Sequence, residues 1–180
     1  MRDYFNKMRG GKTCPARAPW HEILWSAIGS FLGILAVYVL GHLHELRLED
    51  SLFLVGSFGA TAVLIYGIPA SPYAQPRNMI GGHVISAIIG VTCVTVITTS
   101  PAIVAAVAVA LSLVAMHITR TVHPPGGATA LIAVIGGESI HALGYWFVLT
   151  PVAFGAVLML IVALLVNNIS PHRRYPQYWF

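Results

Sequence analysis

Charged side chains are scarce in this sequence: only 9% of its 180 residues are Asp, Glu, Lys or Arg, whereas 57% are hydrophobic. A soluble globular domain carries about 25% charged residues, so this composition excludes an ordinary water-soluble fold. Arg77 is the only charge within residues 51–119, and Glu138 is the only one within residues 121–172. A charge at the centre of a bilayer costs about 2.5–3.5 kcal/mol or more, so segments this poor in charge suit hydrocarbon. The sequence therefore predicts an all-α integral membrane protein.

Cysteine and acidic residues are also rare. Of the two cysteines, Cys14 lies in a basic tail and Cys93 in an apolar segment, which excludes a disulfide framework and a zinc site. Glu138 is the only acidic residue after Asp50, and neither an HExxH nor a GxSxG motif is present. We therefore expect no enzymatic activity, no metal centre and no cofactor.

Positive charge is concentrated at the two ends of the chain. The basic residues that flank the apolar segments are Arg2, Lys7, Arg9, Lys12, Arg17, Arg173 and Arg174. Beside apolar spans, such residues indicate topology rather than nucleic-acid binding, because Lys and Arg concentrate on the cytoplasmic side. We therefore expect both termini to be cytoplasmic. The first apolar run, residues 22–41, is too long for a signal peptide, so a multi-pass protein of a bacterial inner (plasma) membrane is expected.

Four apolar segments are long enough to cross a bilayer core of about 30 Å, which needs about 20 helical residues. These segments are residues 22–41, 79–99, 101–118 and 146–166. Asn78 and the Ser100-Pro101 pair are placed to begin two of these helices, and Pro151 is expected to bend the last one.

Two further apolar segments, residues 51–68 and 124–136, are short and contain several glycines. The Gly-Ala-Thr-Ala sequence of residues 59–62 recurs as residues 127–130, each time between two long spans. The chain is therefore predicted to contain two repeats of helix, short Gly-rich helix or half-helix, and helix. The predicted units are a basic N-terminal tail (1–21), the first repeat (22–99), the second repeat (100–168) and a basic, aromatic C-terminal tail (169–180).

The charges between the spans bear on how the short segments are placed. If both short segments cross the membrane, Arg77 and Arg120 fall on the same side as the termini. If both re-enter instead, these residues lie outside, against the positive-inside rule. Six crossings are therefore favoured, and three crossings per repeat give the repeats opposite orientations. An inverted repeat of this kind is common in secondary transporters.

Short interrupted segments at matching places in two repeats are the sequence pattern typical of a transporter site. A helix that begins inside the membrane exposes unpaired N–H groups and the positive end of its dipole, which can hold an anion. Two such starts are predicted, at residues 57–61 and 123–129. The candidate substrate-binding residues are Ser57, Phe58, Gly59, Ala60, Thr61, His123, Pro125, Gly126, Gly127, Ala128 and Thr129. The alternative is that the small residues only permit close helix packing.

Histidines and arginines near the apolar segments are candidates for moving an anion or a proton. Five of the eight histidines lie in tails or loops, where solvated positions are expected: His21, His42, His44, His141 and His172. The candidates for gating and steering are Arg77, Asn78, His83, His117 and Arg120. The alternative for the two arginines is that they only anchor helix ends at the membrane interface.

The run of residues 123–131, His-Pro-Pro-Gly-Gly-Ala-Thr-Ala-Leu, resembles the signature of the HPP family of integral membrane proteins. Residues 56–64 and 71–83 resemble that family's other well-marked block, and the resemblance covers about residues 22–168. It implies a four-helix membrane protein and a transporter, since plastid and cyanobacterial members are linked to nitrite transport.

The sequence and the resemblance together lead to a functional hypothesis. We expect a transporter or channel for a small anion, nitrite according to the resemblance, with its site between the two Gly-rich helix starts. The expected partners are that anion and the lipid bilayer, without nucleic acid, and self-association into a homo-oligomer is expected of so thin a bundle. The alternatives are a non-transporting assembly or sensor module, and a carrier of a neutral or cationic solute.

Overall fold

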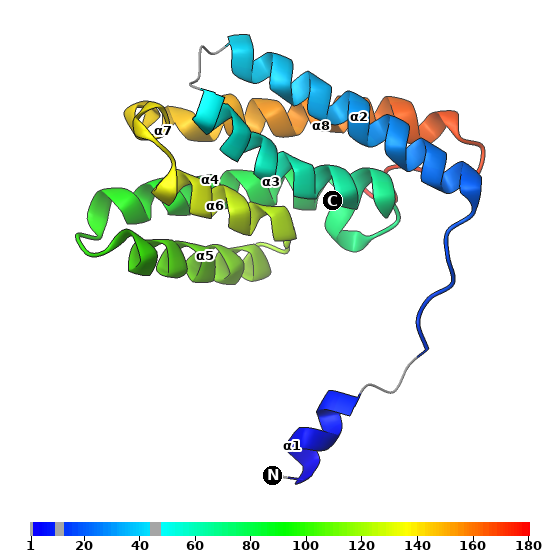
Figure 1. Ribbon diagram of the computed structural model, residues 1–180, viewed down its shortest axis with the longest axis horizontal. Helices are drawn as coiled ribbons and strands as arrows, with labels where there is room; N and C mark the ends of the chain where they lie inside the picture. Colours follow the sequence, from blue (N-terminus) through cyan, green and yellow to red (C-terminus); the bar gives the residue numbers. More distant parts are fainter. Residues whose placement is uncertain (1, 10–12, 44–47) are drawn as a thin grey trace.

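The computed structural model of the chain describes residues 2–9, 13–43 and 48–180, and every regular element within them is helical, as predicted. These elements are α1 (Arg2–Asn6), η1 (Lys7–Arg9), α2 (Trp20–Leu43), α3 (Leu48–Gly67), η2 (Pro72–Ala74), α4 (Pro76–Val96), α5 (Pro101–Ile118), α6 (Pro124–Ile135), α7 (Glu138–Leu143), η3 (Val148–Ala153) and α8 (Phe154–Ile169). The elements from α2 onward form one elongated bundle, and α1 stands apart from it (Figure 1).

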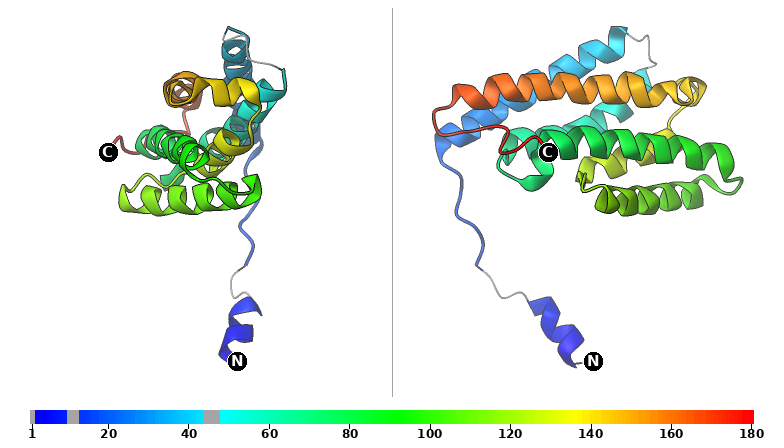
Figure 2. Two further views of the ribbon diagram at one scale, coloured as in Figure 1. Left: turned by 90° about the vertical axis from the view of Figure 1, so that its left-hand side faces the viewer. Right: turned by 180° about the vertical axis from the view of Figure 1, so that it is seen from behind.

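The helices of the bundle alternate in direction along its long axis. α2, α4 and α6 run one way, whereas α3, α5 and α8 run the other way (Figure 2). Within the bundle α2 packs against α3 and α8, while α5 packs against α6 and α4. Corresponding helices of the two predicted repeats thus run in opposite directions, which is the arrangement that an inverted repeat requires. The repeat itself stays a prediction.

Four helical segments of the described residues have the length and apolar composition needed to cross a membrane: Trp20–Val39, Pro76–Val96, Pro101–Ile118 and Val148–Ile169. They match the four predicted spans. α5 has Ser100 at its N-cap and Pro101 at its first position, as expected. The last span bends where Thr150 leaves helical geometry, with φ −139° and ψ 121°, immediately before Pro151. The expected bend is therefore confirmed.

The first predicted helix start is wrong. α3 begins at Leu48 and continues through residues 57–61 without interruption. A Cβ added at Gly59 would meet no other atom within 4 Å, so this glycine does not serve a close contact either. An unbroken helix pairs its backbone groups internally, which hydrocarbon surroundings demand. The second predicted start is present, because α6 begins at Pro124 after the N-cap residue His123.

The predicted helix-capping role of Asn78 is also wrong. α4 begins at Pro76, with Gln75 as its N-cap residue, so Asn78 lies inside the first turn. Its Nδ2 atom instead donates to the carbonyl of Val122, at 2.9 Å. Proline suits the first helical position because the N–H that it lacks has no partner there anyway. The Asn78 side chain thereby links the start of α4 to the segment that precedes α6.

Close backbone packing between α4 and α6 brings the candidate residues together. A Cβ added at Gly82 of α4 would lie 2.5 Å from the Cβ of His123. A Cβ added at Gly126 of α6 would lie 2.8 Å from the carbonyl oxygen of Gly82 and 2.8 Å from Oγ of Ser86. Only glycine fits such contacts, as in other tight helix interfaces in membranes. The packing role that the sequence offered as an alternative thus holds for Gly126.

Candidate functional site

Four polar side chains meet inside the bundle where α3, α4 and α6 pack together. They are Thr61 of α3, His83 of α4, His123 at the N-cap of α6 and Thr129 within α6, and none is more than 1% exposed. The ring of Phe58 covers one side, with its centroid 4.9 Å from that of His83. We call these four residues the His–Thr cluster.

His83 joins the two threonines of the repeated sequence. Its Nε2 lies 2.7 Å from Oγ1 of Thr61, and its Nδ1 lies 2.7 Å from Oγ1 of Thr129. These threonines occupy the same position in the two Gly-Ala-Thr-Ala sequences. The two Gly-Ala-Thr-Ala sequences therefore present equivalent hydroxyls to opposite nitrogens of one imidazole. Oγ1 of Thr61 also lies 3.1 Å from Nε2 of His123, which extends the cluster to a second ring.

A backbone carbonyl fixes the direction of these hydrogen bonds. Nδ1 of His123 lies 2.8 Å from the carbonyl oxygen of Tyr73, which can only accept, so this nitrogen carries the proton. In a neutral ring Nε2 of His123 must then accept, and Thr61 donates to it. Thr61 in turn accepts from Nε2–H of His83, whose Nδ1 accepts from Thr129. With both imidazoles neutral, one continuous chain of donors runs from Thr129 to Tyr73.

The predicted cradle of free backbone amides is not found at residues 57–61 or 124–126. α3 supplies none, because residues 57–61 lie within the helix. At the start of α6, Pro124 and Pro125 have no N–H, and the N–H of Gly126 donates to the carbonyl of His123 at 2.8 Å. The polar groups that these segments offer are therefore side chains, not unpaired amides.

An apolar groove lies next to the cluster, between α3 and the start of α6. It has a volume of about 290 Å³. Its lining residues are Ala60, Val63, Leu64, Ile68, Pro124, Pro125 and Ala128. Of the predicted binding residues, Ala60, Pro125 and Ala128 thus line the groove, while Thr61 and Thr129 point into the cluster. Gly127 contacts neither; a Cβ added there would approach Val109 at 3.7 Å.

Comparison with known proteins identifies the family. The family model of the HPP transmembrane region matches residues 15–176. The chain belongs to the HPP family. Two transmembrane proteins of Dictyostelium discoideum are 46% and 45% identical to this HPP protein over 98% of its length. The chain spans only 57% and 63% of the length of those two relatives. No solved structure matches it.

The family and the four apolar helices establish that this HPP chain is a multi-pass membrane protein. The resemblance noted in the signature of residues 123–131 is confirmed. Three residues of that signature make different contacts. The ring of His123 lies in the cluster, Gly126 packs against the backbone of α4, and the hydroxyl of Thr129 hydrogen-bonds to His83.

The predicted gating residues of the HPP chain lie away from the cluster, except for His83. Nη2 of Arg77 donates to the carbonyl of Thr119 at 2.9 Å, so Arg77 contacts the end of α5. His117 and Arg120 are exposed, and Arg120 has a positive φ of 57° in the turn after α5. The steering roles of these three residues stay predictions.

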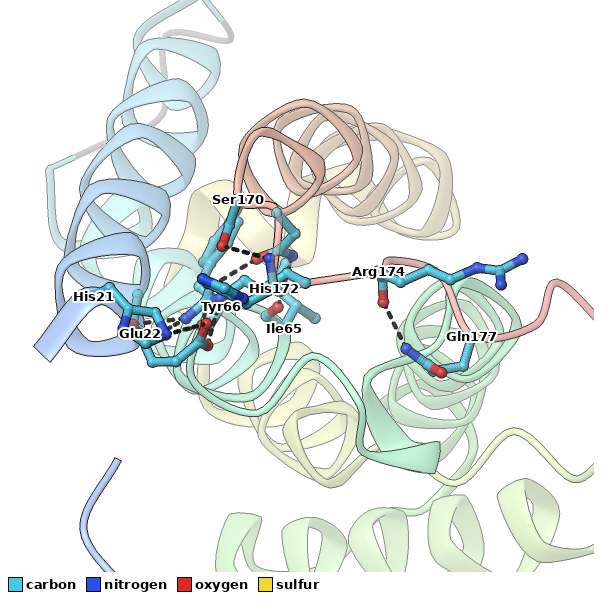
Figure 3. Close-up of polar contacts among 11 residues, drawn as sticks. His21, Glu22, Ile65, Tyr66, Ser170, His172, Arg174 and Gln177 are labelled. Atoms are coloured by element: carbon cyan, nitrogen blue, oxygen red, sulfur yellow. Dashed lines mark hydrogen bonds and ion pairs between the residues drawn. The ribbon is translucent and has the colours of Figure 1, made fainter. Parts of the chain in front are cut away.

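A second polar cluster, which we call the Arg173 cluster, joins the ends of α2, α3 and α8. Nε of Arg173 lies 2.7 Å from Oε2 of Glu22, and its Nη2 donates to the Glu22 carbonyl at 2.7 Å and to Oγ of Ser26 at 2.9 Å. Its Nη1 donates to the carbonyl of Tyr66 and to Oδ1 of Asn167, each at 3.0 Å. Figure 3 shows Glu22 beside Tyr66, with Ser170 and His172 of the C-terminal segment close by.

From the sequence, Arg173 is predicted only as a topology signal, and its cluster is not predicted. Arg173 is only 9% exposed, whereas its neighbour Arg174 is exposed. The available signals were Glu22 at the start of one apolar helix and Asn167 at the end of another, because such residues in apolar helices usually have polar partners.

The segment after Arg173 lies across the turn between α3 and α4. The hydroxyl of Tyr175 donates to the carbonyl of Ala74 at 2.7 Å, and the N–H of Gln177 donates to Oε1 of Gln75 at 2.7 Å. Burial raises the pKa of the Tyr175 phenol above its usual value. The C-terminal segment is therefore part of the folded bundle.

Proposed function

We propose that this protein transports a small monovalent anion, with nitrite as the first candidate, and that the anion passes the His–Thr cluster. That the protein is a multi-pass membrane protein of the HPP family follows from the family match. The substrate rests on the resemblance of the chain to a family with nitrite-transporting members, and on the chemistry of the cluster.

The observation that carries the proposal is the position of the cluster. Polar side chains within apolar helices are costly and usually mark a substrate or ion pathway. Here two imidazoles and two hydroxyls lie at the meeting point of α3, α4 and α6, at most 1% exposed. Packing alone would be served as well by Val and Leu, which would need no hydrogen-bond partners.

The chemistry of the cluster suits a small anion. Nitrite has two acceptor oxygens, and the cluster offers O–H groups from Thr61 and Thr129 and N–H groups from His83 and His123. Hydrogen bonds from these donors would replace part of the water that the anion loses in the membrane. Because the cluster is sealed in this conformation, α3 and α6 must separate for an anion to reach it, and an apolar groove already lies between these two helices.

Nitrite uptake into vesicles reconstituted with the purified protein tests the proposal. We expect protein-dependent uptake that falls at least 10-fold in Thr129→Val, because this change removes the hydroxyl from Nδ1 of His83 and keeps the side-chain shape. Thr129→Ser is the matched control, since it keeps the hydroxyl and should retain most of the uptake. Unchanged uptake by a monodisperse Thr129→Val protein would show that the cluster is not the site.

The second candidate is a non-transporting membrane module, which the sealed state of the cluster favours. In that role His83 would only hold α3 and α6 against α4. The two functions differ in one measurement: a non-transporting module gives no uptake above protein-free vesicles for nitrite at any pH or potential. Competition by other monovalent anions further separates an anion carrier from a carrier of neutral or cationic solutes.

A further inference from the structure

We propose that the anion crosses the membrane together with one proton, which the His–Thr cluster holds next to it. This inference rests on the proposed anion transport and adds a second transported species. Its basis is the juxtaposition of two imidazoles through a single hydroxyl, that of Thr61, inside the bundle.

In the resting cluster both imidazoles are neutral, and every N–H and O–H group donates a hydrogen bond. The chain of donors from Thr129 through His83, Thr61 and His123 to the carbonyl of Tyr73 leaves no hydrogen-bonding atom of either ring unpaired. An imidazolium with no anion beside it is costly in hydrocarbon, so the empty cluster carries no charge.

The same cluster has acceptors for the donors that one added proton would create. Each threonine hydroxyl also faces the carbonyl four residues earlier in its helix: Thr61 Oγ1 lies 3.2 Å from the oxygen of Ser57, and Thr129 Oγ1 lies 3.5 Å from that of Pro125. When Nε2 of His123 gains a proton, it donates to Thr61, and the hydroxyl of Thr61 turns to Ser57. When Nδ1 of His83 gains the proton instead, it donates to Thr129, and the hydroxyl of Thr129 turns to Pro125.

The hydroxyl of Thr61 lets the proton pass from one ring to the other. An N–H bond breaks at Nε2 of His83 while an O–H bond forms at Thr61. The original O–H bond of Thr61 breaks, and an N–H bond forms at Nε2 of His123. One unit of positive charge thus moves from the first ring to the second, and the number of protons is unchanged. Tyr73, whose carbonyl ends the chain of donors, is 46% exposed as a residue, and the neighbouring Pro72 carbonyl accepts from Tyr178, so this end of the path lies near the C-terminal segment.

The groups that face the two rings supply no permanent charge. They are the Phe58 ring and the Thr61 hydroxyl from α3, the Thr129 hydroxyl from α6 and the Tyr73 carbonyl from η2. In the contacts described for this part of the chain, no carboxylate, lysine or arginine side chain reaches either imidazole.

Because no fixed charge contacts the rings, we expect the anion and the proton to bind together. A monovalent anion entering the neutral cluster would be an uncompensated charge in the membrane, and so would a proton. Bound together they form a neutral pair, whose mutual attraction and hydrogen bonds to the cluster offset part of that cost. The transported unit is therefore one anion with one proton, and the cycle moves no net charge.

Flux measurements on reconstituted vesicles test the coupling directly. Nitrite uptake is followed together with the pH inside the vesicles, reported by an entrapped pH dye, while valinomycin and potassium gradients set the membrane potential. Protein-free vesicles correct for nitrous acid that crosses the lipid unaided. We expect one proton per nitrite, uptake independent of potential, and uptake that rises as the external pH is lowered.

The outcomes separate this inference from the proposed function. Protein-dependent nitrite uptake that follows the potential and brings no proton overturns the coupling and leaves anion transport standing. Uptake that does not exceed the protein-free control overturns both.

Substitution of Thr61 tests the inference by the pH dependence of uptake, which would not change if Thr61 had only a structural role. Thr61→Val removes the hydroxyl that joins the two rings, so we expect the proton-coupled uptake to fall at least 10-fold and its pH dependence to flatten. Thr61→Ser keeps the hydroxyl and should keep both the coupling ratio and the shape of the pH profile. Wild-type-like coupling in a monodisperse Thr61→Val protein would overturn the inference.

Discussion

The His–Thr cluster and the Arg173 cluster are both buried among helices, but only the second carries permanent charge. Arg173 uses all five of its N–H donors, on Glu22, Ser26, Tyr66 and Asn167. Because every one of these donors is engaged, the contacts of Arg173 have one arrangement. The imidazoles of the other cluster have two, since each neighbouring threonine hydroxyl has an alternative acceptor.

This difference suits two separate roles, one of holding helices together and one of changing hydrogen bonds. The Arg173 cluster lies at the ends of α2, α3 and α8, where a fixed ion pair can hold helices without entering the centre of the bundle. The His–Thr cluster lies between α3, α4 and α6, where a fixed charge would be costly without a partner. If α3 and α6 move during transport, the Arg173 cluster holds one end of α3 while the centre opens.

Breaking the Arg173 cluster should give the largest loss of stability. Arg173→Ala removes five hydrogen bonds and leaves the Glu22 carboxylate without its cation, which typically costs about 3–5 kcal/mol. The free energy of unfolding, measured by titration with a denaturing detergent, should fall by about this amount. Arg174→Ala is the matched control, because Arg174 is exposed and should change stability by less than about 0.5 kcal/mol. Equal effects of the two substitutions would contradict the structural role of Arg173.

Adding a methyl group at the contact between α4 and α6 should disturb the His–Thr cluster through packing alone. Gly126→Ala would place a Cβ 2.8 Å from the backbone oxygen of Gly82, and such overpacking costs about 1–3 kcal/mol. Gly127→Ala meets only Val109, at 3.7 Å, and gains helix propensity, so it should be neutral or slightly stabilising. Thermal unfolding in detergent compares the two. A Gly127→Ala protein less stable than Gly126→Ala would reverse the assigned roles of these adjacent glycines.

The spans and several candidate residues could be predicted from the sequence, because the bilayer imposes a length and a composition on each helix. The repeated Gly-Ala-Thr-Ala sequence pointed to Thr61 and Thr129, and the family signature pointed to His123; the structure brings all three together. His83 was predicted only as a gating residue, since nothing in the sequence shows that α4 passes between the two threonines.

The predictions that failed depended on backbone details that composition does not determine. Glycine at position 59 suggested a helix start, but a single glycine lies within a membrane helix without breaking it when the neighbouring residues favour the helix. Arg173 gave the same signal in the sequence as Arg174, and only the folded C-terminal segment buries one of them. The pairing of Arg173 with Glu22 joins opposite ends of the chain and has no local signal.

The smallest expected effect concerns how the C-terminal segment supports the Arg173 cluster. Tyr175→Phe removes the hydrogen bond from the phenol to Ala74, so the free energy of unfolding should fall by about 0.5–1.5 kcal/mol. Tyr178→Phe removes a longer bond, 3.2 Å, from a residue that is 40% exposed, and should have almost no effect.

The same substitution should also change the dependence of stability on pH. Because burial raises the pKa of Tyr175, the folded protein keeps the phenolic proton above about pH 10, where the unfolded chain loses it. The unfolded state then binds fewer protons, so the stability that this residue contributes below pH 10 declines as the pH rises. Unfolding curves between pH 8 and about pH 11 should show this decline in the wild type and a weaker one in Tyr175→Phe. Parallel curves would mean that the C-terminal segment leaves the bundle before the phenol ionises, and that the Arg173 cluster holds α2, α3 and α8 without its help.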